Sequence, residues 1–455
     1  MNRTKLGFTV LMTACMLLPT SLVAASGQES LAEDELGPEI WVDGPETVLD
    51  GSGSNHPHVA VDEFGNRVYV WEAGLTTGGA RDDVFVRRFD AAGNSLGDPV
   101  RVNTLIDEAQ ENARVATSSD GSFLVVWESA EPSVVTPTVD RDRVRSQAFD
   151  GDGNKVGTEQ LLSTVSPESL QPLHLDVAAL RVADGSPGGY VVVWSSWTQN
   201  GTDTGKNIQA RLISPNGSPF GGQFQVNGTI SGDQTEPAVA ELPDGGFLVV
   251  FVSPNNKLLG QRFDAAGQPV GSDFQINTTF DNGVSAPDVE LGWDGVVGVI
   301  WEDDEDGLEF EEIRARVFDS DLTPLGPDFR VNNLLTDDQK NPALGNYGPE
   351  GFLAIWGSDE GSTAGDDISK LSVQARLITG QDTFDGLQFQ LNDWIAGRQH
   401  VPAVSGWYGR LGSAFRSDSN KDENSDVIAG RQIEHCIFCD DFKWGSEWRW
   451  PTAVE

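Results

Sequence analysis

One pattern repeats seven times along this chain, and it constrains the fold more than any other feature. Each copy has an apolar run that ends in an aromatic residue, followed by a polar loop, a second apolar run and a tight turn. The aromatic residues, which lie 50 to 67 residues apart, are Trp71, Trp127, Trp194, Phe251, Trp301, Trp356 and, in a weaker seventh copy, Phe415. A repeat of this length predicts an array of similar units, although 455 residues would otherwise suggest about three domains of roughly 150 residues each.

Each repeat carries four strand signals, which we name A to D. Strand A follows a recurrent proline, such as Pro57 or Pro237, and strand B is the run that ends in the aromatic residue. Strand C precedes a tight turn, and strand D ends in sequences such as Phe-Gln-Val-Asn at 224–227. Runs of Val, Ile and Phe without a helical period indicate buried strands. Four strands in about 50 residues are typical of one blade, so the sequence predicts an all-β, seven-bladed β-propeller with four antiparallel strands per blade.

The two ends of the array predict closure of the ring. The seventh repeat has signals for strands A, B and C but no clear strand D, whereas Thr47 to Leu49 stand before the first strand A, where a strand D would lie. We expect this N-terminal strand to complete the last blade and to remove exposed sheet edges. The predicted propeller then spans residues 46–433, with a lead segment at 26–45 and a Cys/Trp tail at 434–455. An open solenoid is the alternative, and it would need polar caps at both ends.

The repeats resemble those of uncharacterised bacterial secreted β-propeller proteins of the form "FLVVW … RFDAAGN … FQVN". The tail from Ile437 to Trp448 is similar to a short C-terminal motif, F-x-D-G-F-E-x-G … W, found on some secreted proteobacterial proteins, with Asp441 and Lys443 in place of the Gly and Glu of the motif. The resemblance implies the architecture and a bacterial secreted protein, and it implies no activity.

Residues 1–25 have the features of a secretory signal peptide. Arg3 and Lys5 precede a mostly apolar stretch, and small residues near Ala25 suit cleavage. An uncleaved membrane anchor and a lipoprotein attached at Cys15 are the alternatives. No later apolar run is long enough to span a bilayer. We expect a secreted protein that is extracellular or at the cell surface, with the periplasm as a further compartment.

The charge of the chain excludes several partners. There are 30 basic and 70 acidic residues, which gives a net charge of -40. Such a surface repels phosphate backbones, so nucleic acid and anionic membranes are poor partners. The acidity fits a saline habitat, where charges are screened, and it fits an ordinary acidic secreted protein equally well. We expect a monomer that binds an extracellular protein or a carbohydrate.

Long, variable loops indicate where a ligand would bind. The A–B and C–D turns are short, whereas the B–C and D–A loops, which share the other face, are long and polar. Binding usually resides in such loops on a rigid scaffold. The candidate ligand-binding residues are Trp394, His400, His56, Arg398 and Trp197. Local packing of the tryptophans and a solvated or capping role for the histidines are the alternatives.

Two further groups of residues suggest a metal site and a disulfide. Oxygen-bearing residues alternate at Asp418, Asn420, Asp422, Asn424 and Asp426, a spacing that suits calcium, although a solvated acidic loop is the alternative. The D-x-D-x-N sequence at 150–154 stands where other repeats have a hairpin turn, so we interpret it as a turn. Cys436 and Cys439 predict a local disulfide in an oxidising compartment. A zinc site would need more ligands, and a redox site would need a following helix in an α/β unit.

The sequence leaves two functions open. It contains no nucleophile elbow, no phosphate-binding loop, no H-E-x-x-H pattern and no repeated S-x-D-x-G-x-T-W box. The first function is a non-catalytic binding or adhesion module that uses the B–C/D–A face. The second is a propeller hydrolase or lyase acting on an extracellular polysaccharide. Converging carboxylates with raised pKa values in the channel would favour the enzyme.

Overall fold

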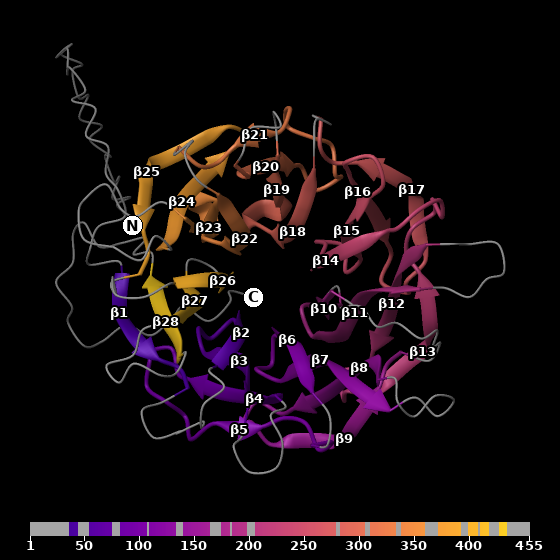
Figure 1. Ribbon diagram of the computed structural model, residues 1–455, viewed down its shortest axis with the longest axis vertical. Helices are drawn as coiled ribbons and strands as arrows, with labels where there is room; N and C mark the ends of the chain where they lie inside the picture. Colours follow the sequence, from indigo (N-terminus) through magenta and orange to yellow (C-terminus); the bar gives the residue numbers. More distant parts are fainter. Residues whose placement is uncertain are drawn as a thin grey trace, which may run out of the picture.

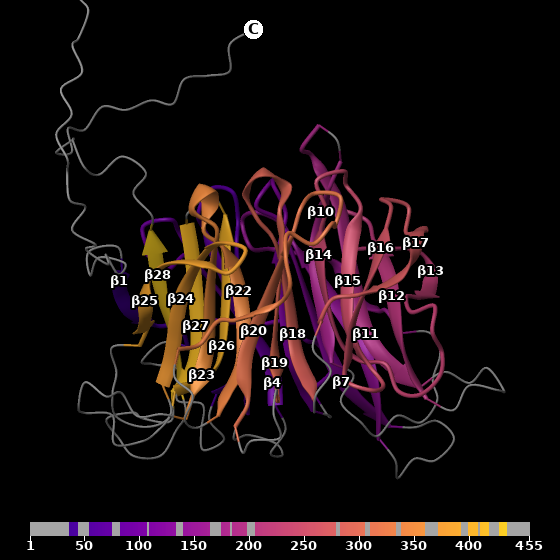
Figure 2. The ribbon, with the colours of Figure 1, turned by 90° about the horizontal axis from the view of Figure 1, so that it is seen from above.

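The computed structural model is a ring of seven four-stranded antiparallel sheets around a central channel (Figure 1). Seen from the side, the strands run along the axis of the ring (Figure 2). The structure describes residues 36–43, 54–74, 82–106, 109–132, 140–163, 174–182, 184–197, 205–278, 283–304, 310–333, 338–359, 372–392, 399–407, 410–417 and 427–434. The prediction of a seven-bladed β-propeller with four antiparallel strands per blade is therefore confirmed. Within the described residues, no helix has the length and apolar character needed to cross a membrane.

We number the blades in the chain order of their innermost strands. The strands of each blade are given from the channel outward. Blade 1 contains β2 (Ser54–Val61), β3 (Arg67–Gly74), β4 (Asp82–Phe89) and β5 (Val100–Arg101). Blade 2 contains β6 (Gln110–Thr117), β7 (Phe123–Pro132), β8 (Asp140–Phe149) and β9 (Lys155–Leu161). Blade 3 contains β10 (Leu175–Arg181), β11 (Pro187–Trp197), β12 (Lys206–Ile213) and β13 (Pro219–Gln225). Blade 4 contains β14 (Thr235–Glu241), β15 (Phe247–Ser253), β16 (Lys257–Phe263) and β17 (Pro269–Gln275).

Blade 5 contains β18 (Val284–Leu291), β19 (Val297–Asp303), β20 (Glu312–Phe318) and β21 (Phe329–Arg330). Blade 6 contains β22 (Gln339–Asn346), β23 (Phe352–Ser358), β24 (Ser372–Gly380) and β25 (Thr383–Gln390). Blade 7 contains β26 (Gln399–Trp407), β27 (Arg410–Ser417), β28 (Val427–Glu434) and β1 (Leu36–Trp41). Two short 3-10 helices, η1 (Trp293–Gly295) and η2 (Gly348–Glu350), follow β18 and β22.

The fourth strand of blade 7 corrects our assignment of the N-terminal strand. Strand β1 pairs with β28, and its Trp41 lies opposite Ala429. We had expected Thr47 to Leu49 in this position; those residues lie outside the described part of the chain, and their assignment to it was wrong. The propeller therefore begins at Leu36, inside the segment that we had treated as a lead. Beyond β1, the N–H of Val42 donates to the carbonyl of Ile428 at 2.9 Å.

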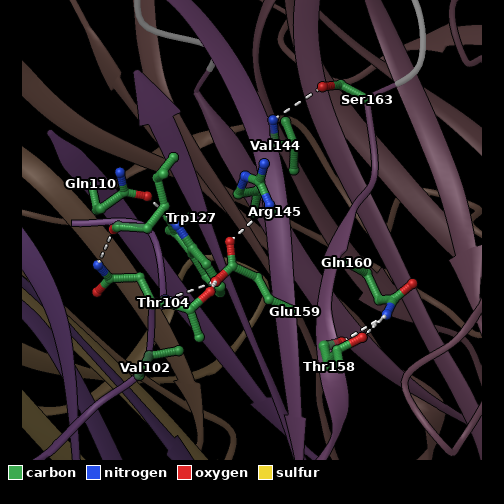
Figure 3. Close-up of polar contacts among 12 residues, drawn as sticks. Val102, Thr104, Gln110, Trp127, Val144, Arg145, Thr158, Glu159, Gln160 and Ser163 are labelled. Carbon is green, nitrogen blue, oxygen red and sulfur yellow. Dashed lines mark hydrogen bonds and ion pairs between the residues drawn. The ribbon is translucent and has the colours of Figure 1, made fainter. Parts of the chain in front are cut away.

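A polar residue after strand D fixes the beginning of strand C in every blade. In blade 2, the hydroxyl of Ser163 accepts the N–H of Val144 at 3.1 Å (Figure 3). An asparagine does the same in the first, third, fourth, fifth and sixth blades, namely Asn103, Asn227, Asn277, Asn332 and Asn392. In blade 7, the carboxylate of Asp43 accepts the N–H of Ile428 at 3.1 Å. The recurrent asparagine of the repeat therefore satisfies a buried backbone donor.

The core lies between neighbouring blades. The aromatic residue that ends strand B is almost completely buried in all seven blades. The indole N–H of Trp127 donates to Gln110 at 2.8 Å, at the beginning of the strand A beside it (Figure 3). The indole N–H of Trp356 donates to Gln339 in the same way, also at 2.8 Å. These buried tryptophans hold strands A and B together. The inner edge of each strand A faces the channel.

Candidate functional site in the central channel

The channel is a cavity of about 870 Å³ lined by the innermost strands of all seven blades. This volume lies in the range of about 300–1,000 Å³ that is typical of small-ligand pockets. The upper end of the channel, where the D–A loops enter strand A, is marked by His56 and Glu236. The lower end, at the A–B turns, includes Trp293 of η1, which is half-buried.

A β-bulge recurs near the beginning of strand A and shapes the upper mouth. Six blades place a residue with positive φ there: His56, Asn112, His174, Glu236, Ala286 and Asn341, with φ between 43° and 56°. A bulge re-aims side chains and is common next to functional sites. Glutamates of the preceding blade accept the N–H of three of these residues, as Glu236 does for Ala286 at 2.7 Å and Glu302 for Asn341 at 2.5 Å. These two glutamates therefore have structural roles.

Two aspartates occupy the same level, two residues beyond the bulge. Asp176 on β10 accepts the N–H of Val239 at 2.8 Å, and Asp288 on β18 accepts the N–H of Leu344 at 2.8 Å. Burial raises the pKa of Asp176 to about 6, against the effect of these hydrogen bonds. Burial, and then the charge of Asp176, raise the pKa of Asp288 to about 7. Both side chains still reach the channel, because neither residue is fully buried.

Glu290 is the acid that stands apart. It lies two residues after Asp288, so the two side chains share one side of β18. Among the described residues, Glu290 has no hydrogen-bond or ion-pair partner. Burial, followed by the charges of Asp288 and Glu241, raises the pKa of Glu290 well above its ordinary value. Glu290 therefore keeps its proton to a higher pH than an exposed glutamate does.

Glu241 on β14 completes the group. It forms an ion pair with Arg181 of the preceding blade. Burial nevertheless raises the pKa of Glu241 to about 7, because the nearby guanidinium offsets only part of the desolvation. The channel thus holds four carboxyl groups from blades 3, 4 and 5 whose pKa values are raised. Such groups can act as general acids or bases.

The predicted site residues are only partly within the described chain. His56 lines the channel mouth, and its Nδ1 lies 3.0 Å from Oε2 of the buried Glu72. This hydrogen bond raises the pKa of His56. His400 lies on β26, which packs beside β2, but its side chain is outside the described part, as are Trp394 and Arg398. Trp197 ends β11, is half-buried and is not among the residues that line the channel.

The predicted metal and disulfide sites fall outside the described residues. Residues 418–426 and 435–455, which include Cys436 and Cys439, are not described. In the described ranges, no group of three or more His, Cys, Asp or Glu residues could hold a metal ion. The turn at 150–154 is confirmed, because Asp150 Oδ1 accepts the backbone N–H groups of Asp152 and Asn154. Calcium binding at 418–426 stays a prediction.

Sequence reasoning missed the four channel acids. For three of them, Asp176, Asp288 and Glu290, the signal lay in the alignment of the strand A sequences on the residue with positive φ. Two residues after it stand His58, Arg114, Asp176, Ala238, Asp288 and Ala343. Two residues further on stand Ala60, Ala116, Ala178, Ala240, Glu290 and Gly345. Glu290 is the only residue with a long side chain in the second series, and this marks it as exceptional.

Comparisons with known proteins give distant structural matches. No family model and no curated protein matches the chain. A protein of unknown function from Dyadobacter fermentans has 10% identity and a TM-score of 0.48, with 87% of this chain and 97% of that chain covered. An α-L-arabinanase from Penicillium chrysogenum, solved with arabinobiose, has 12% identity and a TM-score of 0.47, with coverages of 88% and 98%. The polysaccharide lyase Uly1 has 10% identity and a TM-score of 0.47, with coverages of 83% and 89%. Similarities of this size carry no information on substrate, so the function has to be inferred from the residues of this chain.

Proposed function

We propose that the protein is a hydrolase that cleaves an extracellular polysaccharide in its central channel, with Glu290 as the general acid. The proposal rests on the position and the protonation of Glu290. It lines the channel, has no partner among the described residues, and has a pKa raised well above the ordinary value. Cleavage of a glycosidic bond needs a proton donor of this kind beside the leaving oxygen.

Asp288 is the proposed general base. The Cα atoms of residues two apart on a strand are roughly 6.6 Å apart, so Asp288 and Glu290 are neighbours on one side of β18, as a pair of carboxyl groups acting on one glycosidic bond requires. The N–H groups of Val289 and Leu344 each hold one oxygen of Asp288 and favour its ionised form, against the larger opposing effect of burial. In the proposed step, Asp288 takes a proton from water, and the water oxygen bonds to the anomeric carbon. The glycosidic C–O bond breaks, its electron pair goes to the leaving oxygen, and Glu290 protonates that oxygen.

A second candidate is the non-catalytic binding module predicted from the sequence. One observation favours it. Asp176 and Asp288 each accept a backbone N–H from the next blade, which is a role in the fold that needs no turnover. On this reading the protonated channel acids donate hydrogen bonds to sugar hydroxyls, and the ligand leaves unchanged.

Turnover separates the two candidates. The purified protein is incubated with a panel of neutral and acidic polysaccharides, and new reducing ends are counted. We expect Glu290→Gln to lower kcat about 10²- to 10⁴-fold with little change in KM, because it removes a transferable proton and keeps the shape. Asp321→Asn, at an exposed turn, is the matched control and should leave kcat unchanged. Binding of a polysaccharide without new reducing ends would contradict the hydrolase and support the binding module.

A further inference from the structure

Two hydrogen-bond donors lie across the channel from Asp288 and Glu290. His58 on β2 and Arg114 on β6 occupy the position two residues after the bulge, as Asp176 and Asp288 do in their strands. All four residues line the channel. Strands β2 and β6 lie on the opposite side of the ring opening from β18 (Figure 1). The two acids of β18 therefore face these donors across the channel, whereas Asp176 lies on β10, beside Arg114.

Arg114 forms no ion pair among the described residues. Its guanidinium donates to the carbonyl of Ala113 at 3.0 Å, and among the described residues no acid lies within ion-pair distance. The side chain is half-buried against the channel. Burial, and then the charge of Arg114, lower the pKa of His58, and the same charge offsets part of the rise that burial causes in the pKa of Asp176. A half-buried guanidinium without a counter-ion favours binding of an anion.

His58 supplies a neutral donor beside Arg114. Burial lowers the pKa of His58 to about 3, so its ring is uncharged at neutral pH. Its Nδ1 accepts the N–H of Val115 at 3.4 Å, which leaves the proton on Nε2. A guanidinium and an Nε2–H group on adjacent blades form a pair of donors for one acceptor group.

The large negative charge of the chain does not prevent an anion from entering the channel. Burial holds the pKa values of Asp288 and Glu241 at about 7, so both are partly protonated at neutral pH. Acids on the outer surface act over a Debye length of about 8 Å at physiological ionic strength. Arg114 would contact a bound anion directly, so its attraction outweighs the repulsion from the acids on the outer surface.

We infer that Arg114, together with His58, binds the carboxylate of a sugar residue, so that the substrate is an acidic polysaccharide built from uronic acids. The inference rests on the proposed function, because it takes the bound sugar to be part of the chain that Glu290 and Asp288 cleave. The planar fork of a guanidinium matches a carboxylate with two parallel hydrogen bonds. Arg114 thereby determines specificity, while Glu290 and Asp288 carry the chemistry.

Binding to matched ligands tests the inference. Oligouronates of several linkages, their carboxyl-reduced counterparts and sulfated neutral oligosaccharides are titrated calorimetrically into the Glu290→Gln protein, which does not consume them. We expect the oligouronate to bind about 10- to 100-fold more tightly than the reduced form, as for a hydrogen bond to a charged group. Arg114→Gln should remove this difference and leave the affinity for the reduced form unchanged, and Arg114→Lys should restore part of it. Arg330→Gln, on the outer strand β21, removes the same charge elsewhere and should change nothing.

Several results would overturn the inference. Equal binding of oligouronates and their reduced forms, preference for the sulfated ligands, or an unchanged difference in Arg114→Gln would each do so. Failure of every ligand to bind would also count against it. Uronate binding that depends on Arg114 but is never followed by turnover in the unmutated protein would uphold the inference and contradict the hydrolase.

Discussion

Aspartates at the hairpin turns and aspartates in the channel accept similar hydrogen bonds but have opposite pKa shifts. Asp90 follows strand β4 at the surface, where it accepts the N–H groups of Ala92 and Asn94 and the side-chain amide of Asn94. These bonds lower the pKa of Asp90. Asp288 accepts the N–H groups of Leu344 and Val289, yet burial raises its pKa to about 7. The hydrogen bonds alone therefore do not determine the charge of an aspartate here, because desolvation outweighs them in the channel.

The largest expected effect concerns the two acids of β18. Burial raises the pKa of both acids in the folded state, so their contribution to stability is fully present below the unfolded value near 4. The contribution of Asp288 is lost as the pH rises through about 7. We expect the double variant Asp288→Asn/Glu290→Gln to be more stable than the parent at pH 8, by between about 1 and 4 kcal/mol, and to differ little at pH 4. Denaturant unfolding at constant ionic strength measures this, with Asp321→Asn as the exposed control. Equal stabilisation at both pH values would mean that titration is not the cause.

A smaller effect should follow from Asp176→Asn. The amide oxygen can still accept the N–H of Val239, so the fold should keep its hydrogen bond. The charge that raises the pKa of Asp288 is lost, so that pKa should fall. NMR titration of the Asp288 carboxyl carbon would detect the change. An unaltered titration would show that the two aspartates do not interact.

The smallest effect is expected at the turn. Asp90→Ala removes a surface acceptor whose pKa is lowered, so its contribution is present above a pH of about 4 and is lost as the pH falls below that. The variant should have a slightly lower Tm at pH 7 and no difference at pH 2. Asp90→Asn, which retains an acceptor oxygen, should lose less than Asp90→Ala at pH 7. A loss that persists at pH 2 would indicate a packing defect instead.

The turns and the repeat were predictable from sequence because their physics is local. Asp90 and Asp150 accept bonds from residues two and four positions further along the chain, and the asparagines after strand D bind a donor 19 residues earlier in the same blade. Strand β1, the fourth strand of blade 7, was harder to predict. Its Ile40-Trp41-Val42-Asp43 corresponds to Phe-Gln-Val-Asn, but only the valine is shared. The hydrogen bonds of Val42 and Asp43 reveal the correspondence.

The channel acids were not predictable in the same way. Alternation along a strand shows that Asp288 and Glu290 share a side, but it does not show whether that side meets solvent, a neighbouring blade or a channel. Their raised pKa values depend on burial by strands from other repeats, and the local sequence does not encode this. The sequence did not identify Trp293 as a channel-lining residue either, because it lies in an A–B turn that we had treated only as a short connection.

The origin of β1 near the N-terminus has a consequence for how the protein is made. Trp41 is synthesised early, but its partner Ala429 appears only when nearly all of the propeller has been assembled. Until then, each completed blade can form from neighbouring segments, whereas blade 7 has to wait for both ends of the chain. The entropic cost of this last pairing grows only with the logarithm of the intervening length, and a ring already folded shortens the gap further. We therefore expect the pairing of β1 with β28 to be the final event of assembly, and a chain truncated before β28 would leave β1 without its partner strand.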